Sequence, residues 1–236
     1  MERYGEDKQV FLRFIFNASL ASLSYELALT RAFSISLWYH FAFMVISIAM
    51  LGIGASGTLL SLRPHLRRAE LVPVFGLLFA ATIPLAAVMS NMIPFDPARL
   101  SWDRMQLLFL ALYYLELSVP FFCFGLIVST MFTLFPGRSG AVYSADLLGA
   151  ACGSLSLFAL LAIGGPENVP FIASALVSGA LLLFRERKFR LIALLLLVVN
   201  VFLLIERPAV IQPKISPYKP LTTAMRFPGA KHLATA

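Results

Sequence analysis
The stretch AVYSADLLGAACGSLSLFALLAI, residues 141–163, decides the fold because it is long enough to cross a bilayer as one helix. The hydrocarbon core of a membrane requires about 20 helical residues. One helical stripe combines a phenol, an acid and two glycines: Tyr143, Asp146, Gly149 and Gly153. The glycines permit a second helix to approach closely, and the acid requires a hydrogen-bond donor or a proton. We therefore expect this span to pack against a neighbour through the stripe.

The composition of the whole chain extends this prediction. Hydrophobic residues make up 59% of the 236 residues and charged residues 13%, and the mean hydropathy is +0.84. A soluble domain has about 25% charged residues. Apolar runs occur at residues 10–33, 37–62, 71–93, 106–135, 141–163, 169–184 and 191–205. We expect an all-α, polytopic transmembrane helix bundle of about seven spans within residues 1–206, surrounded by the lipid bilayer.

The remaining residues, 207–236, are Pro-rich and basic and lack apolar periodicity, which predicts a linker or tail.

The net charge of +7 would suggest nucleic-acid binding in a soluble protein, but here the basic residues lie in short loops between apolar runs, so we do not expect nucleic-acid binding. Both cysteines, Cys123 and Cys152, lie inside apolar runs, which favours packing over a metal site. No cofactor or metal is expected.

The first span is unusually polar. Ser19, Ser22, Glu26 and Thr30 recur on one face, which we expect to look into the bundle. Arg13 and Arg31 lie near its two ends, and snorkelling to the headgroups is the favoured interpretation for Arg31. In the fourth span Glu116 shares a face with Tyr113 and Pro120 and is a second deep acid. The candidate buried polar residues are Arg13, Tyr25, Glu26, Arg31, Glu116, Tyr143 and Asp146.

Two partners are open for Asp146. If the first and fifth spans run in the same direction, Arg13 and Asp146 differ in depth by roughly 3 Å, so an ion pair is feasible. The alternative is that Arg13 reaches the headgroups while Asp146 bonds a Ser or Tyr of another helix. Nothing in the sequence fixes these two spans as neighbours.

The second span ends in GIGASG, residues 52–57, which matches the dinucleotide-binding pattern G-x-G-x-x-G. That pattern requires a preceding strand, whereas these glycines lie in an apolar helix. We interpret Gly52, Gly54 and Gly57 as helix-packing residues, like Gly149 and Gly153.

Lys and Arg are unevenly distributed among the loops. With the amino terminus inside, inside segments hold eleven of them and outside loops three. This is the bias that the positive-inside rule requires. We expect a multi-pass protein of the bacterial cytoplasmic (inner) membrane, with seven spans placing the tail outside.

Several stretches resemble a known family. Residues 24–31 (SYELALTR), the glycine-rich end of the second span and residues 143–153 (YSADLLGAACG) resemble the amino-terminal membrane domain of membrane-bound spermidine-synthase-like (polyamine aminopropyltransferase-like) proteins. Residues 215–221 and 226–230 are similar to the join that leads to a Rossmann-like transferase domain in that family. The resemblance implies a catalytic domain for which this chain has no matching positions, so no catalytic residue is expected here.

Three function classes follow. The first is the membrane module of a spermidine-synthase-like protein, which anchors a Rossmann-like transferase domain or subunit or feeds it substrate. The second is a transporter or ion-coupled carrier, in which the deep acids Glu26, Glu116 and Asp146 couple transport. The third is a structural membrane subunit whose acids are helix-to-helix hydrogen-bond partners. The sequence leaves the oligomeric state open.

Overall fold

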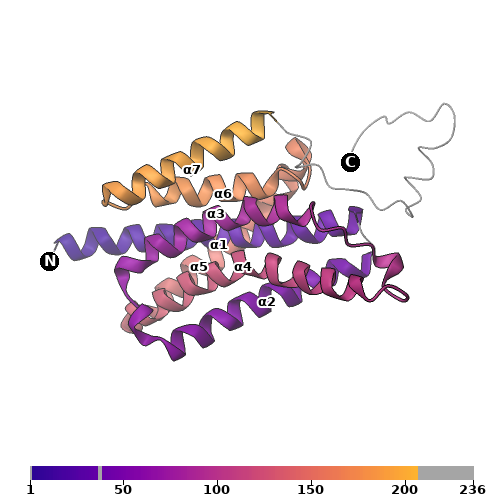
Figure 1. Cartoon of the computed structure of the whole chain (residues 1–236). Coiled ribbons are helices and arrows are strands. Elements are labelled where there is room, and N and C mark those ends of the chain that lie inside the picture. The colour runs from indigo at the N-terminus through magenta and orange to yellow at the C-terminus, as the bar shows by residue number, and fades with distance from the viewer. Residues whose placement is uncertain (1, 37–38, 207–236) are drawn as a thin grey trace.

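Helices form almost the whole computed structural model, which describes residues 2–36 and 39–206 (Figure 1). The described residues contain no strand, so the predicted all-α class is confirmed for them. Their α-helices are α1 (Glu2–Ser36), α2 (Tyr39–Leu62), α3 (Val72–Ser90), α4 (Met105–Leu134), α5 (Ser139–Gly164), α6 (Val169–Leu181) and α7 (Arg187–Glu206). The predicted tail, residues 207–236, lies outside the described residues.

Five of these helices are long and apolar enough to cross a membrane: α2, α3, α4, α5 and α7. Helix α6 has 13 residues and is therefore about 20 Å long, less than the hydrocarbon core of about 30 Å. Helix α1 has 35 residues, but it is too polar to qualify by composition. The described residues therefore indicate a multi-pass membrane protein, while the predicted count of about seven spans is not confirmed.

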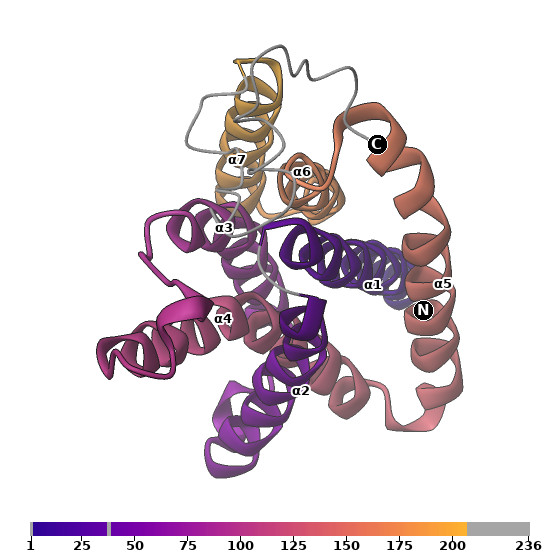
Figure 2. The same cartoon turned by 90° about the vertical axis from the view of Figure 1, so that its right-hand side faces the viewer.

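Helix α1 lies at the centre of the bundle. Figure 2 looks almost along its axis and shows the other helices around it. It packs against α2, α4, α5 and α6, and its residues Phe14, Ile15 and Tyr25 are fully buried. A helix enclosed by other helices does not need an apolar surface toward lipid, because its polar groups can find partners in the bundle. Enclosure explains why a polar helix occupies this position.

Contacts along α1 give the direction of its neighbours. Rings of α1 and α4 meet at Phe11 and Phe135 (5.9 Å between centroids) and again at Phe33 and Tyr113 (5.8 Å), so these two helices are antiparallel. The contact between Phe14 and Phe184 (5.2 Å), together with the cluster of Ala28 and Val169, makes α6 antiparallel to α1 as well. Consecutive helices therefore alternate in direction.

This alternation sorts the charges into two ends. The amino-terminal part of α1 and the α2–α3, α4–α5 and α6–α7 connections lie at the end that we call the basic end, on the left in Figure 1. Its described side chains include Lys8, Arg13, Arg63, Arg67, Arg68, Arg138, Arg185, Arg187, Lys188 and Arg190. The opposite end carries Arg31, Arg99 and Arg104.

The lateral surface of the bundle is apolar. Among the five helices long and apolar enough to cross a membrane, α5 and α7 are the least buried. On α7 the exposed side chains include Leu191, Leu195, Val198, Phe202 and Ile205. A soluble protein rarely exposes so large an apolar surface to water, whereas the lipid of a membrane can cover it.

Candidate functional site
The most extensive helix contact joins α1 and α5, and we call it the α1–α5 seam. Ser24 Oγ of α1 donates a hydrogen bond of 3.0 Å to the Gly153 carbonyl of α5. A Cβ at Gly153 would lie 2.5 Å from the Leu20 carbonyl oxygen, and one at Gly149 would collide with the carbonyl of Phe16. The two helices are parallel, because residue numbers rise together along the contact. The seam joins the start of residues 24–31 to the end of residues 143–153, through the bond from Ser24 to Gly153.

Asp146 lies half-buried in this seam and accepts a hydrogen bond from Ser19 Oγ at 2.5 Å. The predicted ion pair with Arg13 is therefore wrong. Arg13 is exposed at the basic end, and the described residues show no ion pair for it. Arg13 lies three residues before Phe16 and Ser19 three residues after it, so they point to opposite sides of the contact between Phe16 and Gly149. Asp146 lies on the side of Ser19. The alternative, a serine donor for Asp146, is the arrangement found.

Two other residues that were predicted to be buried are exposed. Tyr143 is 55% exposed near the start of α5, and Arg31 is exposed near the end of α1. Like Arg13, they lie close to helix ends, where long amphipathic side chains reach the membrane interface. They are therefore not part of a buried site.

A second polar group lies between α1 and α4, and we call it the Glu116 cluster: Tyr25, Tyr113 and Glu116. Both carboxyl oxygens of Glu116 are buried without a well-formed hydrogen bond, beside the backbone of Ser90. The Tyr25 hydroxyl is also buried without a partner, and its ring stacks on Phe121 (5.5 Å). Glu116 is close enough to both phenols to interact electrostatically. Tyr113 donates to the Ser90 carbonyl at 2.7 Å.

The three deep acids do not form one site. Asp146 lies in the α1–α5 seam near the level of Ser19, whereas the ring contacts on either side of Glu116 place it near residues 25–33 of α1. Glu26 is half-buried on α1, and its carbonyl accepts the Thr30 hydroxyl. No group of three potential metal ligands occurs within the described ranges.

The predicted packing glycines of α2 behave differently from one another. A Cβ at Gly52 would lie 2.5 Å from the Ser118 carbonyl oxygen of α4, so this glycine is required for close approach. A Cβ at Gly54 or Gly57 would meet nothing within 4 Å, so the close packing predicted for them is wrong. Gly54 is exposed and Gly57 is half-buried. Gly125 of α4 packs tightly against Ile53 and was not predicted.

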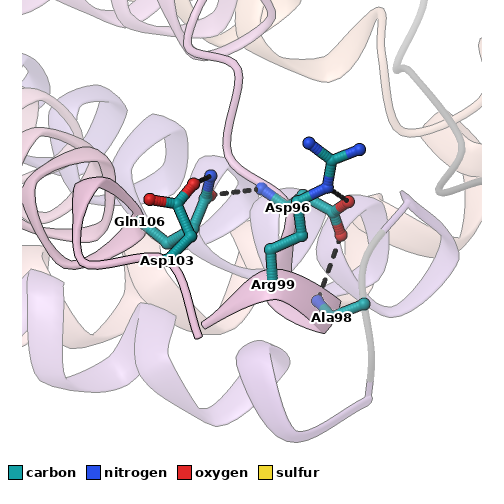
Figure 3. A network of polar contacts seen from close by, with 5 residues as sticks. All are labelled: Asp96, Ala98, Arg99, Asp103 and Gln106. Carbon is teal, nitrogen blue, oxygen red and sulfur yellow. Dashed lines mark hydrogen bonds and ion pairs between the residues drawn. The ribbon is translucent and has the colours of Figure 1, made fainter. Parts of the chain in front are cut away.

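A polar loop closes the opposite end between α3 and α4 (Figure 3). Asp96 forms an ion pair with Arg99 (3.3 Å), and its backbone N–H donates to Gln106 Oε1 (2.9 Å). Gln106 Nε2 donates to Asp103 (3.0 Å), and so does the Met105 backbone N–H (3.0 Å). These two bonds lower the pKa of Asp103 below its ordinary value, and the bond from Gln106 has the larger effect. The network caps the start of α4.

Two grooves lie at the basic end. The larger, of about 550 Å³, is lined by polar and apolar side chains of α1, the α2–α3 connection, α3 and the α6–α7 connection, among them Arg13, Glu70, Phe184, Arg185 and Glu186. The smaller, of about 440 Å³, lies at the start of α7. The sequence showed the basic residues but gave no signal for either groove, because each depends on which helices are neighbours.

Comparison of the chain with protein-family models, with curated proteins and with solved structures found no match. Function must therefore be argued from the seam, the Glu116 cluster and the distribution of charge.

Proposed function
We propose that the chain crosses the bacterial cytoplasmic membrane seven times, with its amino terminus inside. The alternating directions of the helices support this topology, and α1 and α6 can cross because neighbouring helices enclose them. The concentration of Lys and Arg at the basic end supports the orientation, since inside loops are rich in these residues.

Within that topology, the chain serves as the membrane module of a spermidine-synthase-like protein. The observation that supports this function is the α1–α5 seam, because two stretches that carry the resemblance, residues 24–31 and 143–153, touch there at Ser24 and Gly153. Ser24 bonds Gly153, and Ser19 bonds Asp146. Such satisfied contacts suit a rigid framework better than a site that binds and releases an ion. The module holds a Rossmann-like transferase at the membrane or supplies it with substrate.

The position of α7 bears on the kind of partner. Helix α7 ends at Glu206, at the end opposite the basic end. A domain joined after it would start on the outside in the proposed orientation. A transferase on the cytoplasmic side would therefore be a separate subunit.

Cell fractionation tests this function. Deleting the chain from its source cell should move spermidine-forming activity from the membrane fraction to the soluble fraction, and restoring the chain should return it. Purified alone with decarboxylated S-adenosylmethionine and putrescine, the chain should form no spermidine. Activity whose location does not depend on the chain, or turnover by the purified chain, would contradict the proposal.

The Glu116 cluster favours a second candidate, an ion-coupled carrier. A buried carboxyl without a good partner lowers stability, and membrane proteins retain such groups mainly for function. If this cluster exchanges protons, Glu116→Gln should raise the free energy of unfolding in detergent and abolish proton uptake into proteoliposomes driven by a pH gradient. If the cluster is structural, the same variant should lower stability and leave proton uptake unchanged. Glu186→Gln, at an exposed carboxyl, is the matched control.

A further inference from the structure
The smaller groove at the basic end has an unusually simple lining. Its walls are Leu182, Arg187, Arg190, Leu191 and Leu194, and it encloses about 440 Å³. Among the described residues, two guanidinium groups and three leucines line it, and no acid does. It lies on α7, whose apolar side chains largely face outward.

The register of α7 orders these groups by depth. Arg187, Arg190, Leu191 and Leu194 follow the spacing that places residues on one helical face. The arginines occupy the first turn, at the basic end, and Leu194 lies about 10 Å beyond Arg187 and about 6 Å beyond Arg190 along the axis. Leu191 is 57% exposed and Leu194 47%, so both remain open to the surroundings. The groove therefore changes from cationic to apolar in the direction in which a lipid enters a bilayer.

The charges in this groove have no ion-pair partner in the part of the chain that the structure describes. Among the described residues neither Arg187 nor Arg190 forms an ion pair. The first turn of α7 contains no acid, and Glu186, just before it, lines the larger groove instead. The positive end of the helix dipole adds to the repulsion among these cations. An anion between the two guanidinium groups would remove this unfavourable arrangement.

We propose that this groove binds an anionic phospholipid of the leaflet at the basic end. The phosphate lies between Arg187 and Arg190, and an acyl chain lies along Leu191, Leu194 and Leu182. Guanidinium groups match phosphate oxygens in geometry as well as charge. The leucines distinguish a lipid from a free phosphate, since inorganic phosphate would leave them exposed. The inference requires only that the helices lie in a bilayer, and it holds for either orientation.

The test uses the whole chain in detergent, with bound lipid counted by native mass spectrometry after titration with phosphatidylglycerol or phosphatidylcholine. Phosphatidylglycerol should bind more tightly. Each of Arg187→Gln and Arg190→Gln should weaken its binding about fivefold, and the double variant about twentyfold. Leu194→Asn should also weaken binding, whereas glycerol phosphate, which lacks acyl chains, should not displace the lipid.

The matched control is Arg63→Gln combined with Arg68→Gln, which removes the same charge from exposed positions at the same end. It should leave phosphatidylglycerol binding within twofold of the parent. An equal loss in both double variants would show attraction to the whole basic end and would overturn the proposal. Equal binding of the two lipids, or displacement by glycerol phosphate, would overturn it as well.

Discussion
At the scale of single residues, Asp146 shows how an acid can lie in the bundle without a cation. Ser19 Oγ, at 2.5 Å, satisfies one carboxyl oxygen from the neighbouring helix. The acid is only half-buried, so its remaining hydrogen-bonding capacity is not confined to the protein interior. This arrangement avoids the cost of burying an ion pair, which often exceeds the Coulomb energy gained.

A double-mutant cycle on Ser19→Ala and Asp146→Ala should give a coupling of about 1 kcal/mol in the free energy of unfolding, the scale measured for hydrogen bonds between membrane helices. Unfolding in mixed detergent micelles provides the measurement. A parallel cycle of Arg13→Gln with Asp146→Ala should be additive, because these residues do not interact. Coupling between Arg13 and Asp146, together with additivity between Ser19 and Asp146, would instead support the ion pair.

Asp103 gives a prediction about pH. Its pKa is lowered by the bonds from Gln106 and Met105, so the ionised form stabilises the start of α4. This stabilisation is complete above the unfolded pKa of about 3.9 and is lost as pH falls through the lower folded value. Hydrogen exchange at the Met105 amide, corrected for intrinsic rate, should therefore accelerate below about pH 4. In Asp103→Asn the exchange should be faster at pH 7 and lose this dependence.

At the scale of helices, the seam depends on the absence of side chains at two glycines. Gly149→Ala should destabilise the protein by about 1 to 3 kcal/mol, because the new methyl group would collide with the Phe16 carbonyl and force the helices apart. Gly54→Ala makes the same chemical change where nothing lies within 4 Å, and it should be neutral or slightly stabilising. Thermal unfolding in detergent compares them. Equal effects would mean that helix propensity, rather than packing, sets the cost.

The sequence predicted helix type well and helix partners poorly. Length and hydropathy were sufficient for α5, and its small-residue stripe correctly indicated a close neighbour. The stripe did not identify α1 as that neighbour, and it did not indicate that Ser19 rather than Arg13 would bond Asp146. Gly52, Gly54 and Gly57 look alike in sequence, yet only Gly52 faces another helix. Tyr25 and Glu116 come together only because α1 and α4 are antiparallel neighbours, a pairing for which hydropathy carries no signal.

At the scale of the whole molecule, a central polar helix changes how hydropathy should be interpreted. Hydropathy measures compatibility with lipid, so it is high for the outer helices α5 and α7 and lower for α1, which other helices enclose. Enclosure also gives the serines of α1 their partners. The number of crossings must therefore be judged from the direction of each helix and from whether it runs from one end of the bundle to the other, rather than from composition.

Cysteine labelling in intact cells tests the topology, in a parent from which Cys123 and Cys152 have been replaced by Ala. Cysteines at Arg68 and Lys188, at the basic end, should be protected from an impermeant maleimide. Cysteines at Ser101 and Glu167, at the opposite end, should be labelled. Membrane permeabilisation should make the first pair reactive, which shows that protection reflects location.

Each alternative topology gives a different labelling pattern. If α6 failed to cross, positions 167 and 188 would behave alike, because only this helix separates them. If α1 failed to cross, a cysteine at Lys8 would be labelled while Arg68 stayed protected. Reversal of both pairs would keep seven crossings but place the amino terminus outside. The expected pattern, with Lys8 protected as well, requires that both α1 and α6 cross despite their polarity and length, because alternation brings every second connection back to the basic end.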